Sequence, residues 1–188
     1  MSLTMQYIKI FLNDLYPSMC IDKDASKFII DLYKPIISKY RKIKNKPSKQ
    51  WHKLTEQILP KELARNATNN VYRTFAKNGE NLIAKITIKG SHEFDLFINA
   101  IISYLVEELI YIVGKYVKKY NPVEGIIFAK HILHVVSKDN DFAMLIPNTM
   151  ISMAMNVSTL KERAKFEGIS GYSKLNKKEL IKLLKSKV

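Results

Sequence analysis

The sequence predicts an all-α protein, and three observations support this class. Apolar residues recur at helical spacing in one segment after another, as Ile8, Phe11, Leu12 and Leu15 do near the start of the chain. The same order of a short, a long and a short helical segment occurs twice. A composition of 47% hydrophobic and 26% charged residues is sufficient for a buried core. We therefore expect two fused helical units, followed by a small helical pair.

The first unit is expected to occupy residues 1–79. Its helices are predicted at residues 5–16, 23–40, 48–59 and 60–75. Asp22 is a suitable N-cap for the second of these helices, and Ser48 is a suitable N-cap for the third. Pro35 falls inside the second helix, where we expect it to cause a kink.

A proline corner is the most informative local feature of the first unit. Pro60 follows two apolar residues directly, and Lys-Glu-Leu-Ala continues the chain without a loop. Proline disfavours helical geometry at the preceding residue, Leu59, and it is favoured at the first position of a helix. The pattern predicts that one helix ends at this corner and that the next begins immediately.

The second unit is expected at residues 80–146. Its helices are predicted at residues 82–88, 96–120, 126–137 and 142–146, with an acidic turn at 138–141. The Ile-Thr-Ile alternation in 82–88 is also compatible with a strand. Asp95 is expected to cap the long helix. That helix contains the longest apolar run of the chain, but Glu107 and Glu108 interrupt it, which favours a buried core helix over a membrane span.

The end of the chain predicts a linker at residues 147–158 and a small helical module at 159–188. Ser158 or Thr159 is expected to cap a helix at 160–167, and Gly168 to end it. Asn176 is expected to cap a last helix at 177–186.

Charge is distributed unevenly along the chain. The protein carries a net charge of +14, with +9 in residues 1–79, −1 in residues 80–155 and +6 in residues 156–188. Residues 34–53 contain eight basic residues and no acidic one. Such a balance is typical of a protein that binds a polyanion, most often nucleic acid, although a lysine-rich soluble protein is the plainer alternative.

The sequence lacks the usual patterns of an enzyme. It has neither a phosphate-binding glycine loop nor a motif for a serine or cysteine nucleophile. His131 and His134 could share a helix face, but no third ligand for a metal is indicated. We therefore expect no enzyme activity, no cofactor and no metal site. The single cysteine, Cys20, suits a reducing compartment and is expected to pack as a small hydrophobic residue.

Two groups of motifs resemble histones. Tyr16-Pro17 with Ile21-Asp22, and the corner Ile58-Leu59-Pro60-Lys61-Glu62-Leu63-Ala64, are similar to type 2B core histones. The stretch from Ala100 to Leu109, with Gly114, His131-Ile132 and Asp139-Asn140-Asp141, is similar to type 2A histones. The two in this order resemble the fused histone doublets of large DNA viruses. Residues 160–184 resemble an SAP-like or Rho N-terminal-like helical module.

The resemblance implies two tandem histone folds that clasp each other in an intramolecular handshake. It implies packaging of double-stranded DNA through contacts that are largely independent of sequence, in a virion and a host nucleus or viral factory, or otherwise in the nucleus. A partner resembling type 3 and type 4 histones is implied as well, with no membrane and no small-molecule substrate. The alternative is a histone-fold scaffold or regulator that recruits protein partners to DNA.

The clasp implies two groups of residues that bind nucleic acid, the C-terminal module adds a third, and the resemblance implies one acidic patch. The first group contains Lys44, Lys46, Ser48, Lys49, Ser91 and His92. The second group contains Lys23, Lys118 and Lys119. The third group, in the C-terminal module, contains Tyr172, Ser173, Lys174, Lys177 and Lys178. The acidic patch contains Glu108, Asp139 and Asp141.

Overall fold

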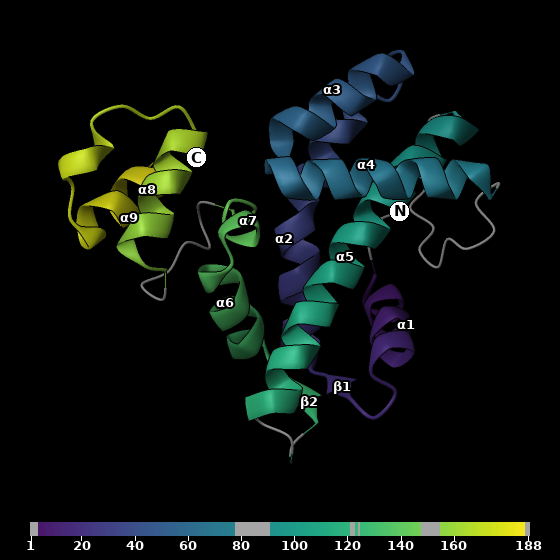
Figure 1. Ribbon diagram of the computed structural model, residues 1–188, viewed down its shortest axis with the longest axis horizontal. Coiled ribbons are helices and arrows are strands. Elements are labelled where there is room, and N and C mark those ends of the chain that lie inside the picture. The colour runs from purple at the N-terminus through teal and green to yellow at the C-terminus, as the bar shows by residue number, and fades with distance from the viewer. Residues whose placement is uncertain (1–3, 78–90, 121–122, 124, 148–154, 187–188) are drawn as a thin grey trace.

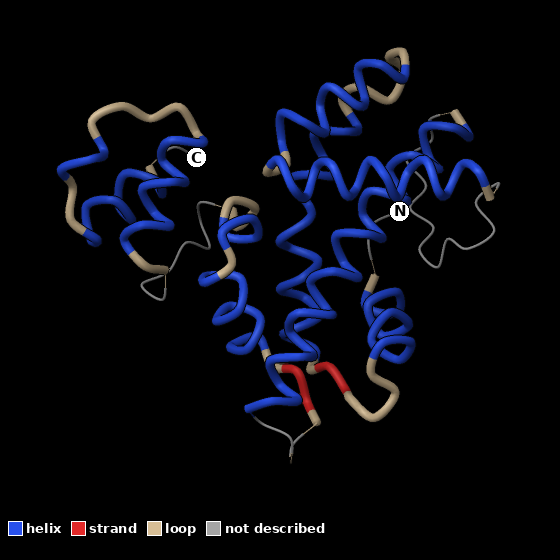
Figure 2. Tube along the Cα trace, in the orientation of Figure 1, coloured by secondary structure: helices blue, strands red, loops and turns tan. Residues whose placement is uncertain are grey.

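The computed structural model describes residues 4–77, 91–120, 123, 125–147 and 155–186 of the chain. These residues are mostly helical, and their strands form a sheet of two very short members (Figures 1 and 2). The predicted all-α class is confirmed. The predicted segment 82–88 and most of the predicted linker lie outside the described residues.

The elements fall into a body and a C-terminal module, which Figure 1 shows side by side. The body contains α1 (Met5–Leu15), β1 (Cys20–Ile21), α2 (Lys23–Arg41), α3 (Ser48–Ile58), α4 (Lys61–Ala76), α5 (His92–Tyr120), β2 (Ile126–Ile127), α6 (Ala129–Lys138) and α7 (Asn140–Ala143). The module contains α8 (Val157–Phe166), the 3-10 turn η2 (Tyr172–Lys174) and α9 (Lys177–Lys185).

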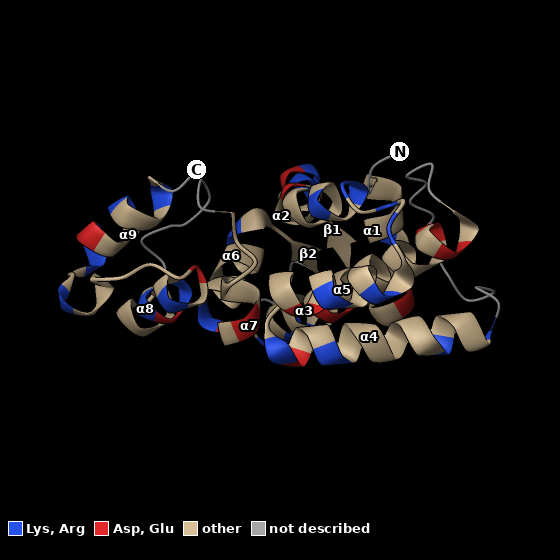
Figure 3. Cartoon of the chain, turned by 90° about the horizontal axis from the view of Figure 1, so that it is seen from above, with Lys and Arg blue, Asp and Glu red and all other residues tan. Residues whose placement is uncertain are grey.

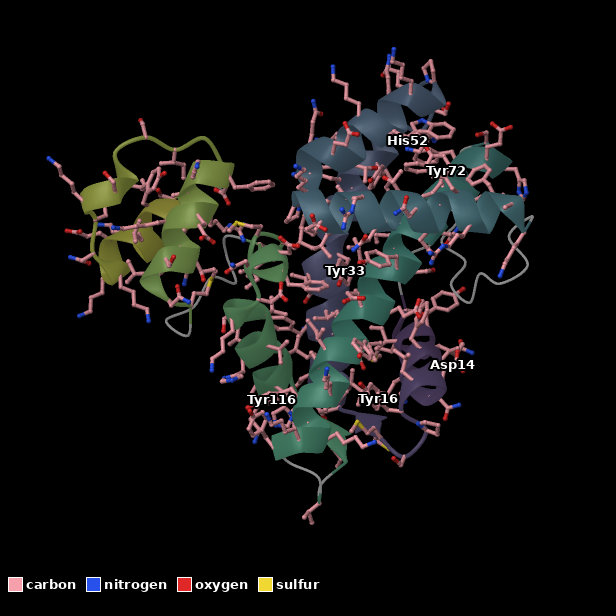
Figure 4. The ribbon with its side chains drawn as sticks, viewed as in Figure 1. Asp14, Tyr16, Tyr33, His52, Tyr72 and Tyr116 are labelled. Carbon is pink, nitrogen blue, oxygen red and sulfur yellow. The ribbon has the colours of Figure 1, made fainter. Side chains whose placement is uncertain are left out.

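Helix α5 is the centre of the body, and it packs against α1, α2, α4 and α6. Of the described helices, α5 has the length and hydropathy of a membrane span, but 67% of its most apolar window is buried inside the protein. This burial fits the predicted core helix. Tyr33 of α2 is fully buried, and its hydroxyl donates a hydrogen bond of 2.7 Å to the carbonyl oxygen of Leu105 (Figure 4). The two long helices of the body therefore meet at their middles.

Strands β1 and β2 join two loops that are far apart in the sequence. They pair in parallel, with Cys20 opposite Ile126 and Ile21 opposite Ile127. The Cys20 amide donates to the Gly125 carbonyl oxygen at 2.8 Å. The predicted helix from 126 onward was therefore wrong at its first two positions, which form β2. The pairing ties the start of α2 to the segment that follows α5.

The predicted proline corner is present, displaced by one residue. Leu59 is extended, with φ −109° and ψ 145°, and Pro60 is the N-cap of α4 instead of its first helical residue. Helix α4 then lies across α5, where the Asn70 side chain donates a hydrogen bond of 2.9 Å to the Ala100 carbonyl oxygen. Helix α2 runs without interruption through Pro35.

Three predicted N-caps were wrong, because each helix begins earlier than its predicted cap residue implies. Helix α5 begins at His92, where the Ser91 hydroxyl accepts a hydrogen bond of 3.1 Å from the Phe94 amide, so Asp95 lies inside the first turn. Helix α3 begins at Ser48 itself, after Pro47. Helix α8 begins at Val157, because the Asn156 side chain accepts a hydrogen bond from the Thr159 amide.

The end of the body also differs from the prediction. Asp139 caps α7 by accepting hydrogen bonds from the amides of Asp141 and Phe142, at 3.0 and 2.9 Å. The predicted acidic turn is therefore partly helical, and the predicted helical turn at 142–146 begins earlier. The predicted linker is also shorter at its end, because residues 157 and 158 already belong to α8.

The module contributes apolar residues to the continuous core of the protein and has a polar link to the body. Leu160, Ala164, Leu180 and Leu184 are fully buried. Arg163, only 5% exposed, donates hydrogen bonds of 2.7 Å from Nη1 to the Ala143 carbonyl oxygen and from Nε to Glu167. Burial lowers the pKa of Arg163, an effect that its pairing with Glu167 opposes. The arginine thus connects α8 to the end of α7.

Candidate nucleic-acid interface

A cleft of about 360 Å³ lies where the segment before α3 meets the start of α5. Its lining contains Lys44, Asn45, Lys46, Pro47, Ser48, Trp51, Ser91 and Glu93. Four residues of the first predicted group therefore come together, although they are up to 47 positions apart in the sequence. The other two, Lys49 and His92, are exposed in the first turns of α3 and α5 and do not line the cleft.

Two helices begin at this cleft. No side-chain hydrogen bond caps the start of α3, and the start of α5 is capped by a neutral hydroxyl. Helix N-termini carry partial positive charge and amide donors, so they favour phosphate and other anions. Lys44 and Lys46 add full charges, while Glu93 is the one acidic residue of the lining. The cleft therefore suits an anion, held away from Glu93.

Trp51 forms the buried wall of the cleft and holds its two sides together. Its ring contacts Phe94 and Phe97 of α5, at centroid distances of 5.0 and 5.6 Å. The side chain is 5% exposed, and its indole nitrogen has no hydrogen-bond partner among the described residues. This packing fixes the start of α3 against the start of α5.

The second predicted group is only partly assembled. The β1–β2 pairing holds Lys23, the first residue of α2, at the end of the body where α5 finishes (Figure 1). Lys118 and Lys119 are exposed in the last turn of α5. Lys119, however, lines a different cleft, between α5 and α6.

The third predicted group lies on one part of the module. Tyr172, Ser173 and Lys174 form η2, and Lys177 and Lys178 begin α9. The carbonyl oxygen of Ser173 accepts a hydrogen bond of 2.6 Å from Lys161. Asn176 and Glu179 already cap the start of α9 with reciprocal hydrogen bonds, so any anion bound here depends on the lysines more than on the helix terminus.

The predicted acidic patch forms a cluster that is larger than expected. Partial burial raises the pKa of Glu108, and the charges of Asp139 and Glu107 raise it further. Burial, Asp139 and Glu62 raise the pKa of Asp141 in the same way. Acidic residues are visible both on α7 and at the start of α4 (Figure 3). Glu62 could not be assigned to this patch from the sequence, because the proline corner brings it near Asp141 only in the folded chain.

A second cleft, of about 630 Å³, was not predicted. It lies between α5 and α6, and its lining contains Ile112, Lys115, Tyr116, Lys119, Tyr120, His134, Val135, Lys138 and Asp139. The four-residue spacing of Lys115 with Lys119, and of Tyr116 with Tyr120, places each pair on one helix face. That spacing was the signal in the sequence that could have indicated this surface.

Cys20 and His131 lie in different environments. Cys20 is exposed, so its predicted role as a packed hydrophobic residue was wrong. His131 is buried, and its Nδ1 accepts a hydrogen bond of 3.2 Å from the Phe128 amide at the start of α6. Within the described residues, no group of three or more His, Cys, Asp or Glu side chains could hold a metal ion.

No protein-family model matches this chain, and no curated protein is similar to it in sequence.

Proposed function

We propose that the protein is a histone-like binder of double-stranded DNA, in which two histone folds on one chain clasp each other and compact DNA through phosphate contacts. The observation that carries this proposal is the cleft between residues 44–48 and 91–93, which gathers two lysines and two helix starts. Duplex DNA presents phosphates at regular spacing, and lysines with helix N-termini bind them without reading the base sequence.

Two further features favour the clasped arrangement. The parallel β1–β2 pair joins the loop before α2 to the loop after α5, as expected when the first loop of one fold lies beside the second loop of the other. The hydrogen bond from Tyr33 to Leu105 joins the middles of the two long helices. A partner on the same chain is present at high effective concentration, which favours this pairing at any protein concentration.

The test compares duplex binding of the wild type with that of a variant in which Lys44, Lys46 and Lys49 are changed to Glu. The matched control changes Lys9, Lys27 and Lys61 to Glu, three exposed lysines that do not line the cleft. Both variants change the net charge equally. Affinity for a random duplex is measured by fluorescence anisotropy at several salt concentrations.

We expect the cleft variant to bind much more weakly and the control to bind nearly as well as the wild type. If all three lysines contact phosphates, the slope of log affinity against log salt falls by about 3, since each contact contributes roughly 0.9. Equal losses in the two variants would mean that only overall charge matters, and the proposed interface would then be wrong.

The acidic cluster favours a second candidate, a histone-fold scaffold that recruits proteins to DNA. Glu62, Glu107, Glu108, Asp139 and Asp141 share one surface, and repulsion among them makes a cationic partner favourable. A partner resembling type 3 and type 4 histones would add such basic surface. Tight protein binding with weak duplex affinity would support the scaffold, whereas nuclease protection of a discrete DNA length would support packaging.

A further inference from the structure

The cleft between α5 and α6 combines a cluster of aromatic rings with a cationic rim. The ring of Tyr116 lies 4.9 Å from the ring of His134 and 5.0 Å from the ring of Tyr120, centroid to centroid. Tyr120 is 59% exposed, and the ammonium group of Lys119 lies 5.1 Å from its ring centroid. Tyr116 faces α6 at the lower end of α5 in Figure 4.

The charges of this cleft are predominantly positive. Lys115, Lys119 and Lys138 are exposed and line it, together with the single carboxylate of Asp139. One oxygen of Asp139 already accepts the two hydrogen bonds that cap α7. Lys138 adjoins that carboxylate in the sequence, so a bound anion is better placed at Lys115 and Lys119, one turn apart on α5.

We propose that this cleft binds an unpaired nucleotide, whose base stacks on the rings of Tyr120 and His134 while its phosphate contacts Lys115 and Lys119. Stacking on aromatic side chains with cationic contacts to the backbone is how proteins hold single-stranded nucleic acid. A simple anion needs no rings, and an apolar ligand needs no lysines, so the combination selects a planar group that carries phosphate. A volume of about 630 Å³ lies within the usual range of ligand sites.

This site does not depend on the duplex interface proposed above. It shares no residue with the cleft at residues 44–48 and 91–93. A paired base is stacked inside its duplex and cannot present its face to Tyr120, so the two sites take different forms of nucleic acid. The nucleotide could be free or part of a single strand, and the experiment separates these sources.

The experiment measures the binding of a fluorescent single-stranded oligonucleotide, a blunt duplex of the same length, thymidine monophosphate and inorganic phosphate. The variants are Tyr120→Ala, His134→Ala and, as control, Tyr72→Ala. Tyr72 is an exposed tyrosine of α4 that does not line the cleft. Circular dichroism checks that each variant is folded, and Tyr120→Phe keeps the ring while removing the hydroxyl.

We expect Tyr120→Ala and His134→Ala each to lose roughly 5- to 150-fold in affinity for the single strand, which is the range for one stacked base. Tyr120→Phe and Tyr72→Ala should bind like the wild type, and duplex affinity should change little in all variants. If the wild type binds thymidine monophosphate and Tyr120→Ala weakens that binding, the ligand is a free nucleotide. Binding of the oligonucleotide only would identify a strand.

The proposal would be overturned if both alanine variants bound the single strand as tightly as the wild type does. It would also be overturned if inorganic phosphate or an acidic peptide displaced the labelled strand as well as an unlabelled strand does. The Lys44, Lys46 and Lys49 variant separates this outcome from failure of the duplex proposal. This variant should lose duplex binding. Adding Tyr120→Ala to it should still reduce single-strand affinity by the same factor as in the wild type.

Discussion

The ring of Tyr16 occupies the space where a side chain at Gly114 would lie, and its hydroxyl donates a hydrogen bond of 2.8 Å to the Tyr111 carbonyl oxygen (Figure 4). The loop after α1 is thereby held against the last third of α5. A β-carbon at position 114 would overlap the ring.

The close packing predicts that Gly114→Ala destabilises the protein, by about 1–3 kcal/mol as is usual for overpacking. Chemical denaturation measures the free energy of unfolding of this variant, of Tyr16→Ala and of the double variant. The alanine should cost much less once the ring is removed. An equal cost in both backgrounds would show that the ring and the glycine do not interact.

Tyr33→Phe should destabilise the protein by about 1 kcal/mol at neutral pH, since it removes the hydrogen bond to Leu105. Burial raises the pKa of Tyr33 well above its ordinary value. Between about pH 10 and that raised value, the unfolded chain loses this proton while the native state keeps it, so stability falls as the pH rises. Urea titrations from pH 7 to 11 should show a shallower fall for the variant than for the wild type. Tyr72→Phe, at a side chain that is 61% exposed, is the control and should follow the wild type.

Glu108→Gln should stabilise the protein at pH 7, by less than about 1 kcal/mol because the site is partly exposed. The pKa of Glu108 is raised by burial, Asp139 and Glu107, so the native state holds its proton to a higher pH than the unfolded chain does. The wild type therefore loses stability as the pH rises from about 4 through that raised pKa, whereas the glutamine variant does not. Thermal unfolding at pH 7 and at pH 3.5 tests this, and the gain should disappear at the lower pH. Glu162→Gln, at an exposed position on α8, should give no gain.

Arg163→Leu should loosen the module from the body. The substitution removes the donor to the Ala143 carbonyl oxygen and leaves Glu167 without this partner. Hydrogen–deuterium exchange should become faster in α7 and α8 while α2 and α5 keep their protection. Lys165→Leu, an exposed position on the same helix, is the control. Unchanged exchange in α7 would mean that apolar contacts suffice to hold the module.

Periodicity and proline chemistry predicted most helices of this fold. Pro60 and Asn176 lie at the helix boundaries they were expected to mark, because their effects are local. The β1–β2 pair could not be predicted, since two-residue strands have no periodicity and their pairing depends on the packing of α2 against α5. Ser91 was missed as a cap because Asp95 offered an equally suitable side chain four residues later.

In the candidate site, too, features that depend on neighbouring residues could be predicted, whereas features that depend on the packing of distant helices could not. The basic segment 34–53 was evident from composition, and the resemblance to histones brought Ser91 into the same group. The structure places Lys44, Lys46, Ser48 and Ser91 in one cleft, but it directs Lys119 toward α6. The aromatic cleft and the inclusion of Glu62 in the acidic cluster depend on how helices meet, which spacing along one helix cannot supply.

The parallel pairing of Cys20 with Ile126 also constrains how the chain is made. During synthesis, the first forty residues leave the ribosome long before the strand that completes them. The apolar sides of α1 and α2 therefore remain uncovered until α5 and β2 have emerged, because α5 supplies much of the surface that buries them. Contacts between residues so far apart in the sequence slow folding and prolong the exposure of apolar surface. Nascent chains that stop before residue 127 should accordingly recruit chaperones, and release should follow once β2 is available to pair.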